Sequence, residues 1–184
     1  PPLPPHWQQP VEDYLAHLAV ERRLSPRTTT AYRHQLEALA PALIEAGAGQ
    51  WSEVRRDQVR LAISAAHRRG LAPASLALML AALRSYYRWL RQTRYPELLN
   101  PVQGIKPPKA ARRLPAVLDA DAVTQLVEIP DDERLSTRDR ALLELFYSSG
   151  LRLSEVAALR WQDLDLADGS VRVLGKGSKT RIVP

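Results

Sequence analysis

The amino-acid sequence predicts a mainly α-helical protein, with a four-helix domain followed by a smaller mixed α and β unit that contains a β-hairpin. Three observations lead to this fold class. Apolar residues recur at helical spacing in four segments before residue 95, proline and basic residues then interrupt the pattern, and apolar residues alternate on both sides of a glycine-bounded turn near residue 176. We therefore expect domains over residues 1–105 and 116–184, joined by a linker over 106–115.

The first two helices follow from apolar spacing and from the positions of proline. Residues 11–23 carry one apolar face. Ser25 can accept hydrogen bonds from free backbone N–H groups and Pro26 suits a first turn, so a second helix is expected from there to about residue 46. Because an interior proline costs roughly 3 kcal/mol, Pro41 predicts a kink or an early end.

The third and fourth helices complete the first domain. Residues 57–69 form an amphipathic segment that ends in two arginines before Gly70, which is typical of a helix C-terminus. Pro73 opens a fourth helix that continues through Leu90 with good helix formers. Four helices with short connections predict a compact bundle.

The linker and the second unit differ from the first domain in composition and in the spacing of apolar residues. Between Lys106 and Arg113 the chain has four positive charges, no negative charge and stiffening prolines, so we expect this segment to lie against DNA phosphates. Strands around Val171 and Ile182 flank the turn 175–178 as a β-hairpin. The second of these strands has no predicted partner beyond it, on the side away from the first strand, which suggests a truncated domain. Three helices are expected before the hairpin, over residues 119–128, 136–150 and 152–160.

Composition and charge favour a nucleic-acid partner. The formal net charge is +6, and 22 of the 26 basic residues are arginine, whose planar guanidinium can donate two hydrogen bonds to one phosphate. A GC-rich coding sequence is the alternative explanation of this bias. The net charge is +5 over residues 1–105 and +1 over 106–184, so the electrostatic footprint on DNA is expected on the first domain.

Several classes of protein are disfavoured. The chain has no cysteine, which excludes disulfides and thiolate metal sites, and its four histidines lack paired spacing, so no bound transition metal is expected. No apolar run approaches the roughly 18 residues of a membrane span, and the first ten residues do not resemble a signal peptide. A soluble cytoplasmic protein without a membrane partner is therefore expected.

Two motifs carry a family resemblance. Residues 147–155 read Tyr-Ser-Ser-Gly-Leu-Arg-Leu-Ser-Glu, and residues 171–179 contain Gly-Lys-Gly. This pair, together with residues 24–28 and 83–90, resembles the phage integrase family of tyrosine recombinases, most closely the bacterial XerC and XerD group. The resemblance implies an N-terminal fragment, in which a SAM-like core-binding domain precedes the truncated start of an α+β catalytic domain.

The resemblance also implies roles for Arg152 and Lys176, and helical spacing gives one to Glu155. Arg152 is the first catalytic arginine, which would stabilise the negative charge that builds on a DNA phosphate under attack. By resemblance Lys176 would protonate the leaving 5′ oxygen. Glu155, three residues after Arg152, is expected on the same side of a helix and would hold that guanidinium in place. The plainer alternatives are a capping arginine, an ordinary helix salt bridge and a solvated turn lysine.

The rest of the catalytic pattern is absent from this sequence. No histidine is followed by arginine at the third position after it, and the six tyrosines lie in or beside predicted helices, where packed aromatic side chains are expected. Trp7, Trp51, Trp89 and Trp161 are expected to be core or interface anchors. The fragment is therefore expected to bind DNA without cleaving it.

Candidate DNA contacts lie on two helices, on the linker and beyond the hairpin turn. On the helices, the alternative to DNA contact for any single residue is a place on a solvent-exposed helix face. On the linker and the hairpin, the basic side chains are expected to meet backbone phosphates or solvent. The candidates are Arg27, Thr28, Tyr32 and Arg33 on the second helix, Arg84, Tyr87, Arg88 and Arg91 on the fourth, Lys106, Lys109, Arg112 and Arg113 on the linker, and Lys179 and Arg181.

The resemblance further implies partners. These are double-stranded DNA with a dif-like site, a XerD-type recombinase in a heterotetramer and a septal DNA translocase. The process that the resemblance implies is the resolution of chromosome dimers on the nucleoid at cell division. No cofactor is expected, because a phosphotyrosine link conserves the bond energy. Three alternatives remain open: a phage or transposon integrase, an architectural module whose Arg152 and Lys176 only grip phosphate, and a helical adaptor protein.

Overall fold

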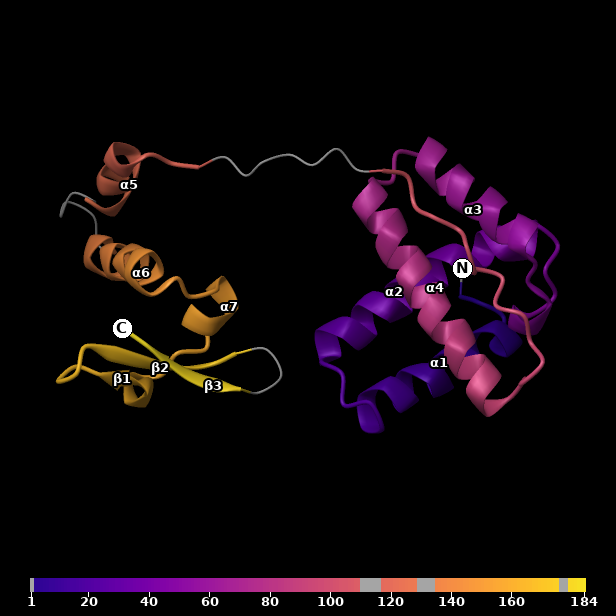
Figure 1. The fold of residues 1–184 in the computed structure, drawn as a ribbon, viewed down its shortest axis with the longest axis horizontal. Coiled ribbons are helices and arrows are strands. Elements are labelled where there is room, and N and C mark those ends of the chain that lie inside the picture. The colour runs from indigo at the N-terminus through magenta and orange to yellow at the C-terminus, as the bar shows by residue number, and fades with distance from the viewer. Residues whose placement is uncertain (1, 110–116, 129–134, 176–178) are drawn as a thin grey trace. The chain divides into compact units, whose positions relative to one another are not determined.

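The computed structural model describes residues 2–109, 117–128, 135–175 and 179–184. The chain divides into two compact units, residues 1–112 and 113–184 (Figure 1). The division falls within the range expected for the linker. In the described ranges the first unit is helical and the second combines helices with a small antiparallel sheet, as the sequence predicts.

Four α-helices build the first unit. They are α1 (Pro5–Val20), α2 (Pro26–Glu45), α3 (Arg56–Arg68) and α4 (Pro73–Thr93), with a short 3₁₀ turn at Trp51–Glu53 before α3. The prediction for α1 was wrong at both ends, because the helix begins six residues earlier, contains Pro10 and ends before Arg23. Tertiary packing explains the early start: the Trp7 and Trp51 rings lie 4.6 Å apart, and the Trp51 indole donates to the Trp7 carbonyl at 2.8 Å.

The second helix begins as predicted and passes through its proline. Ser25 accepts a hydrogen bond from the Thr28 amide at 3.3 Å, which confirms the cap. The helix does not end early at Pro41 but continues to Glu45. Pro41 lies on the exposed side, while Leu39 and Leu43 are buried around it, so burial of the neighbouring turns offsets the one hydrogen bond that proline removes.

An aromatic cluster fills the core of the first unit. Tyr86 packs against Tyr14, Trp51 and Trp89, with ring centroids 4.9–5.9 Å apart. Val102 and Ile105 are also buried, which extends this unit through the segment after α4. The sequence placed the domain boundary close to that point.

The second unit has a smaller core, built around Leu151, Val156, Val171 and Val173. Its helices are α5 (Ala120–Val127), α6 (Ser136–Ser149) and α7 (Leu153–Val156), followed by a 3₁₀ turn at Trp161–Asp163, and its strands are β1 (Leu164–Asp165), β2 (Ser170–Leu174) and β3 (Thr180–Val183). The hairpin of β2 and β3 is confirmed, with Val173 opposite Arg181 and Leu174 opposite Thr180. Two expectations were wrong: the helix over 152–160 is one short turn, and a third strand, β1, pairs with β2.

The tryptophans do not all lie in a core. Trp7, Trp51 and Trp89 are buried as anchors of the first unit, whereas Trp161 is 77% exposed in this structure. Among the described residues, no helix is both long and apolar enough to cross a membrane, and no three metal-binding side chains of the His, Cys, Asp or Glu type gather in one place.

Candidate functional site

The candidate site of the second unit begins at a sharp turn between two helices. Helix α6 ends at Gly150, whose φ of 59° is in the left-handed region that glycine adopts without a side-chain penalty. Two residues later, Arg152 takes an extended conformation as the N-cap of α7. The turn therefore places the Arg152 side chain at the start of a helix, where 67% of it is exposed.

Glu155 fixes Arg152 through both backbone and side chain. Its Oε2 accepts a hydrogen bond from the Arg152 amide at 2.8 Å, and its Oε1 accepts one from Arg152 Nη1 at 2.9 Å. Only 5% of the Glu155 side chain is exposed. The carboxylate is therefore buried, while the Arg152 guanidinium that it binds reaches solvent. This is the geometry that the sequence predicted for the pair, although a capping position rather than a long helix face creates it.

Arg181 is the second partner of the same carboxylate. From strand β3 it donates to Glu155 Oε1 from Nη1 at 2.8 Å and to Oε2 from Nη2 at 2.9 Å. These hydrogen bonds, and next the one from the Arg152 amide, lower the pKa of Glu155 from 4.5 to about 2. Glu155 is therefore ionised at neutral pH and pairs with two arginines.

Gly175 lies against this ion pair at the end of β2. A Cβ atom there would come within 3.0 Å of Arg181 Nη1 and 3.3 Å of the Lys179 carbonyl oxygen. The Gly175 amide donates to that carbonyl at 2.7 Å, across the base of the hairpin turn. Lys176, predicted as the general acid, follows Gly175 in the chain and lies outside the described residues, so its role stays a prediction.

Sequence reasoning assigned Arg181 to DNA or solvent and did not anticipate its bond to Glu155. The chemistry available here is anion recognition by Arg152, because its exposed guanidinium is oriented by a carboxylate that Arg181 also neutralises. One sequence signal pointed to Arg181, since alternation along β3 places it on the same face as Val183, which packs against the core.

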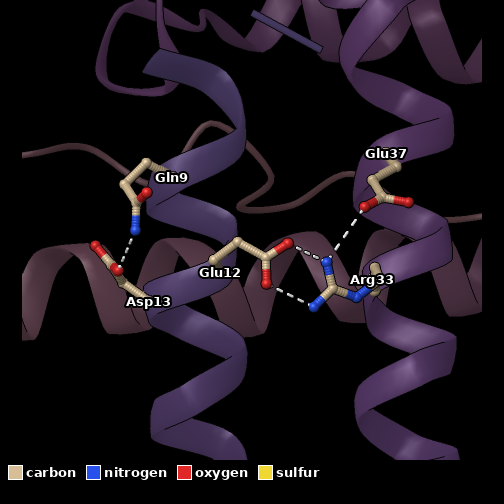
Figure 2. Close-up of polar contacts among 5 residues, drawn as sticks. All are labelled: Gln9, Glu12, Asp13, Arg33 and Glu37. Carbon is tan, nitrogen blue, oxygen red and sulfur yellow. Dashed lines mark hydrogen bonds and ion pairs between the residues drawn. The ribbon is translucent and has the colours of Figure 1, made fainter. Parts of the chain in front are cut away.

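Several of the DNA-contact candidates in the first unit are engaged within the protein. Tyr87 is fully buried and its hydroxyl donates to the Trp51 carbonyl at 2.7 Å, so its assignment to the DNA-contacting set is corrected to a core residue. Arg84 donates to the Ile105 carbonyl and ties α4 to the segment after it. Arg33 lies between two carboxylates of α1 and α2, those of Glu12 and Glu37 (Figure 2).

The remaining candidates of this unit lie nearer the surface. Arg27, Arg88 and Arg91 are exposed, whereas Thr28 and Tyr32 are half-buried. Thr28 shares a 2.9 Å hydrogen bond with the Ser25 hydroxyl, so its polar group takes part in the helix cap. Tyr32 and Arg88 line the same hollow, which brings together two side chains from different helices.

The start of the linker borders a basic groove that sequence reasoning missed. Lys106 lines an open hollow of about 530 Å³ with Arg60, His67 and Arg68 of α3. Residues 60, 64, 67 and 68 of α3 share one helix face, and that spacing was the available signal. Lys109 and Lys179 are exposed, and Arg112 and Arg113 lie outside the described residues.

Comparison with known proteins decides the family. A model described as "Phage integrase, N-terminal SAM-like domain" matches residues 11–94, and one described as "Phage integrase family" matches residues 116–184. The chain is 53% identical over 175 residues to tyrosine recombinase XerC of Xanthomonas campestris pv. campestris (strain B100), and 50% identical over 174 residues to that of Xylella fastidiosa (strain M23). The chain belongs to the phage integrase family of tyrosine recombinases. These matches cover 95% of the chain but only 54% and 59% of the relatives.

Solved structures agree with this phage integrase fold. A lambda integrase dimer bound to a COC′ core site matches with a TM-score of 0.71 and 18% identity, over 96% of this chain and 47% of that one. XerH recombinase bound to a palindromic difH substrate matches with a TM-score of 0.66 and 18% identity, over 94% and 52%. At this identity the likeness concerns the fold.

Proposed function

We propose that this chain is part of a XerC-type tyrosine site-specific recombinase. In this proposal it binds DNA and contributes the catalytic arginine Arg152. The observation that supports it is the exposed guanidinium of Arg152, held by a buried carboxylate that Arg181 also binds. A surface arginine whose only role is to cap a helix does not need a buried carboxylate to hold its guanidinium. A guanidinium that must meet a reacting phosphate gains from being fixed in advance.

In the proposed reaction a tyrosine oxygen attacks a DNA phosphorus and the bond to the 5′ oxygen breaks. The product is a 3′-phosphotyrosine and a free 5′ hydroxyl, so no phosphate bond energy is lost and no cofactor is consumed. Arg152 stabilises the charge on the non-bridging oxygens, and Lys176 donates the proton to the 5′ oxygen. In this proposal the nucleophile lies in the part of the full-length protein outside these 184 residues, so the 184-residue chain is expected to bind DNA without cleaving it.

The proposed target is double-stranded DNA with a dif-like site, bound jointly with a XerD-type recombinase in a heterotetramer. In this role the protein resolves chromosome dimers on the nucleoid at cell division, in the cytoplasm and in concert with a septal DNA translocase. Support comes from relatives named XerC at 45–53% identity. Lambda integrase and a transposon integrase match at 13–20% identity. Such a likeness supports the fold of this chain and does not favour an integrase role.

The test is a suicide substrate, a nicked duplex whose cleavage traps the covalent intermediate. The full-length natural protein should form a DNA adduct on a dif-like duplex, and the 184-residue chain should only shift it reversibly. Arg152→Ala in the full-length protein should slow adduct formation by about 10²-fold or more. Arg160→Ala removes an exposed arginine nearby and is the control. An undiminished rate with Arg152→Ala, or no adduct from the full-length protein, would contradict the proposal.

A further inference from the structure

The segment that follows α4 takes the chain back along the helix that it has just left. Figure 1 shows residues 94–109 returning from the C-terminal end of α4 toward its N-terminal end. Residues 105–108 line a hollow together with His67 and Arg68, which end α3 shortly before α4 begins. The 21 residues of α4 span about 30 Å, so the chain leaves the first unit roughly that far from the end of its last helix.

Two buried side chains hold this segment in place. Val102 is fully buried and Ile105 is 6% exposed, and both belong to the core of the first unit. The side chain and the carbonyl of Asn100 accept hydrogen bonds from the amides of Val102 and Gln103, at 3.0 and 3.1 Å. The Ile105 amide donates to the Val102 carbonyl at 3.1 Å. The segment is therefore folded against the unit through these residues.

One side chain from α4 and one from α3 also contact the segment. The Arg84 guanidinium, in the middle of α4, donates from Nη2 to the Ile105 carbonyl. Gly104 has a φ of 74°, and a Cβ atom there would come within 3.0 Å of Arg56 Nη2. A glycine at this position allows both the turn and the close approach of Arg56.

The burial of the chain ends at Ile105. Within 106–109 and 117–119, the described residues between Ile105 and α5, no residue is buried. Arg84 therefore bonds to the last buried position that the structure describes before α5.

We infer that residues 100–105 form a clip that sets where the linker leaves the first unit, and that Arg84 is the residue that closes it. The inference rests on the proposed function, in which both units bind one DNA duplex. With the clip closed, residues 106–119 join the two units and can span at most about 50 Å. With the clip open, residues 94–119 join them and can span about 90 Å.

The length of this connection affects DNA binding, because the second unit to bind is already attached to the first. Its effective concentration falls roughly as the −3/2 power of the connection length once the connection exceeds the span that it must cover. Opening the clip should therefore lower the duplex affinity of the 184-residue chain about two- to threefold. Arg84 thus acts through the length of the connection, whereas the sequence suggested that it contacts DNA.

The first test measures whether Arg84 closes the clip. Because the chain has no cysteine, Val102→Cys introduces a single thiol, which is buried while the clip is closed. Maleimide should label this thiol slowly, and Arg84→Ala should speed labelling about tenfold or more, since it removes a hydrogen bond from a charged group. Arg88→Ala removes an exposed arginine one turn further along α4 and should leave labelling slow.

Circular dichroism should show the same helical content in the three labelled proteins, which excludes global unfolding as the cause. Rapid labelling with Arg84 in place would show that the clip is open in solution. Equal rates with and without Arg84→Ala would show that Arg84 does not close it. Either result would overturn the inference.

The second test measures duplex affinity by fluorescence anisotropy at several salt concentrations. Arg84→Ala should weaken binding about two- to threefold without changing the slope of log affinity against log salt. An insertion of about twelve Gly/Ser residues after Lys109 lengthens the connection as much as opening the clip does, and should weaken binding equally. A slope reduced by about 0.9 in Arg84→Ala would instead show that Arg84 contacts a phosphate. Unchanged affinity in both variants would show that the connection length has no effect on binding.

The outcomes separate this inference from the proposed function. If the unchanged protein binds duplex DNA but Arg84→Ala does not speed the labelling of Val102→Cys, the clip is refuted and the proposed function stands. If the unchanged protein shows no salt-dependent duplex binding, the proposed function fails and the effect on affinity fails with it. The labelling rates then still decide whether Arg84 closes the clip.

Discussion

Glu155 and Arg181 share two hydrogen bonds of 2.8 and 2.9 Å, although 26 residues separate them in the sequence. The bond joins α7 to β3, and through the carboxylate it also reaches Arg152. The orientation of the candidate catalytic arginine thus depends on a hairpin strand that follows it. Mutation of Arg181, or of Gly175 beside it, should therefore affect the Arg152 guanidinium.

Arg181 should act as a positioning residue for Arg152. In the full-length recombinase, Arg181→Ala should slow cleavage roughly tenfold to a hundredfold, because small misplacements of a catalytic group have effects of this size. DNA affinity should change little, since Arg181 is turned toward Glu155. Single-turnover cleavage of a suicide duplex measures the rate, and anisotropy measures the affinity.

Partial recovery with Arg181→Lys would support this role, because lysine keeps the charge but cannot make the paired hydrogen bonds. Arg172→Ala on the neighbouring strand removes an exposed arginine and is the matched control. A loss of affinity equal to the loss of rate would instead show that Arg181 contacts DNA directly.

The low pKa of Glu155 predicts a loss of stability in acid. Its pKa is about 2 in the folded protein and near 4.5 when unfolded, so its stabilising effect is complete above pH 4.5 and is lost as the pH falls through about 2. An NMR titration of the Glu155 carboxylate should therefore show a midpoint near 2. In Arg181→Ala the midpoint should move up toward 4.5, because Arg181 is the largest cause of the shift. A midpoint near 4.5 in the unchanged protein would mean that the two-arginine arrangement does not persist in solution.

Local signals in the sequence predicted most of the fold. Ser25, Gly70 and Gly150 mark helix ends that the structure has where expected, because caps and left-handed glycines act over a few residues. The hairpin was also found from local signals, namely alternating apolar residues on both sides of a glycine-bounded turn. The start of α1 was not, since it depends on Trp7 meeting Trp51 across the core.

The site was less predictable than the fold, for a related reason. Arg152 and Glu155 are three residues apart, so their contact could be expected from sequence. The partnership of Glu155 with Arg181 depends on how β3 packs, and a sequence does not give that directly. Tyr87 was misassigned because it stands next to Arg88 in the sequence, although its spacing of four residues from Leu83 and three from Leu90 places it on the buried face of α4.

Gly150 should tolerate only residues that adopt a left-handed conformation. Its φ is 59° and a Cβ would meet nothing within 4 Å, so the effect of substitution is purely conformational. Gly150→Ala should destabilise the second unit by about 1–2 kcal/mol. Gly150→Asn should cost less, because asparagine is enriched in this region of backbone space. Thermal and urea unfolding of the 184-residue chain measure both, and equal losses would contradict a conformational cause.

Gly175 should be restricted for a different reason, which is the space that the ion pair occupies. Gly175→Ala places a methyl group 3.0 Å from Arg181 Nη1 and 3.3 Å from the Lys179 carbonyl oxygen. Because Arg181 is held by Glu155 and the carbonyl belongs to the backbone, neither can move freely, and overpacking of this kind costs about 1–3 kcal/mol.

A double-mutant cycle separates the two clashes. If the contact with Arg181 dominates, Gly175→Ala should cost less in the Arg181→Ala background than in the unchanged protein, and the two losses should not add. If the losses add, the carbonyl contact accounts for the effect, and the glycine serves the hairpin turn rather than the ion pair. Urea unfolding of the four proteins distinguishes these results, and only non-additivity would link Gly175 to the orientation of Arg152.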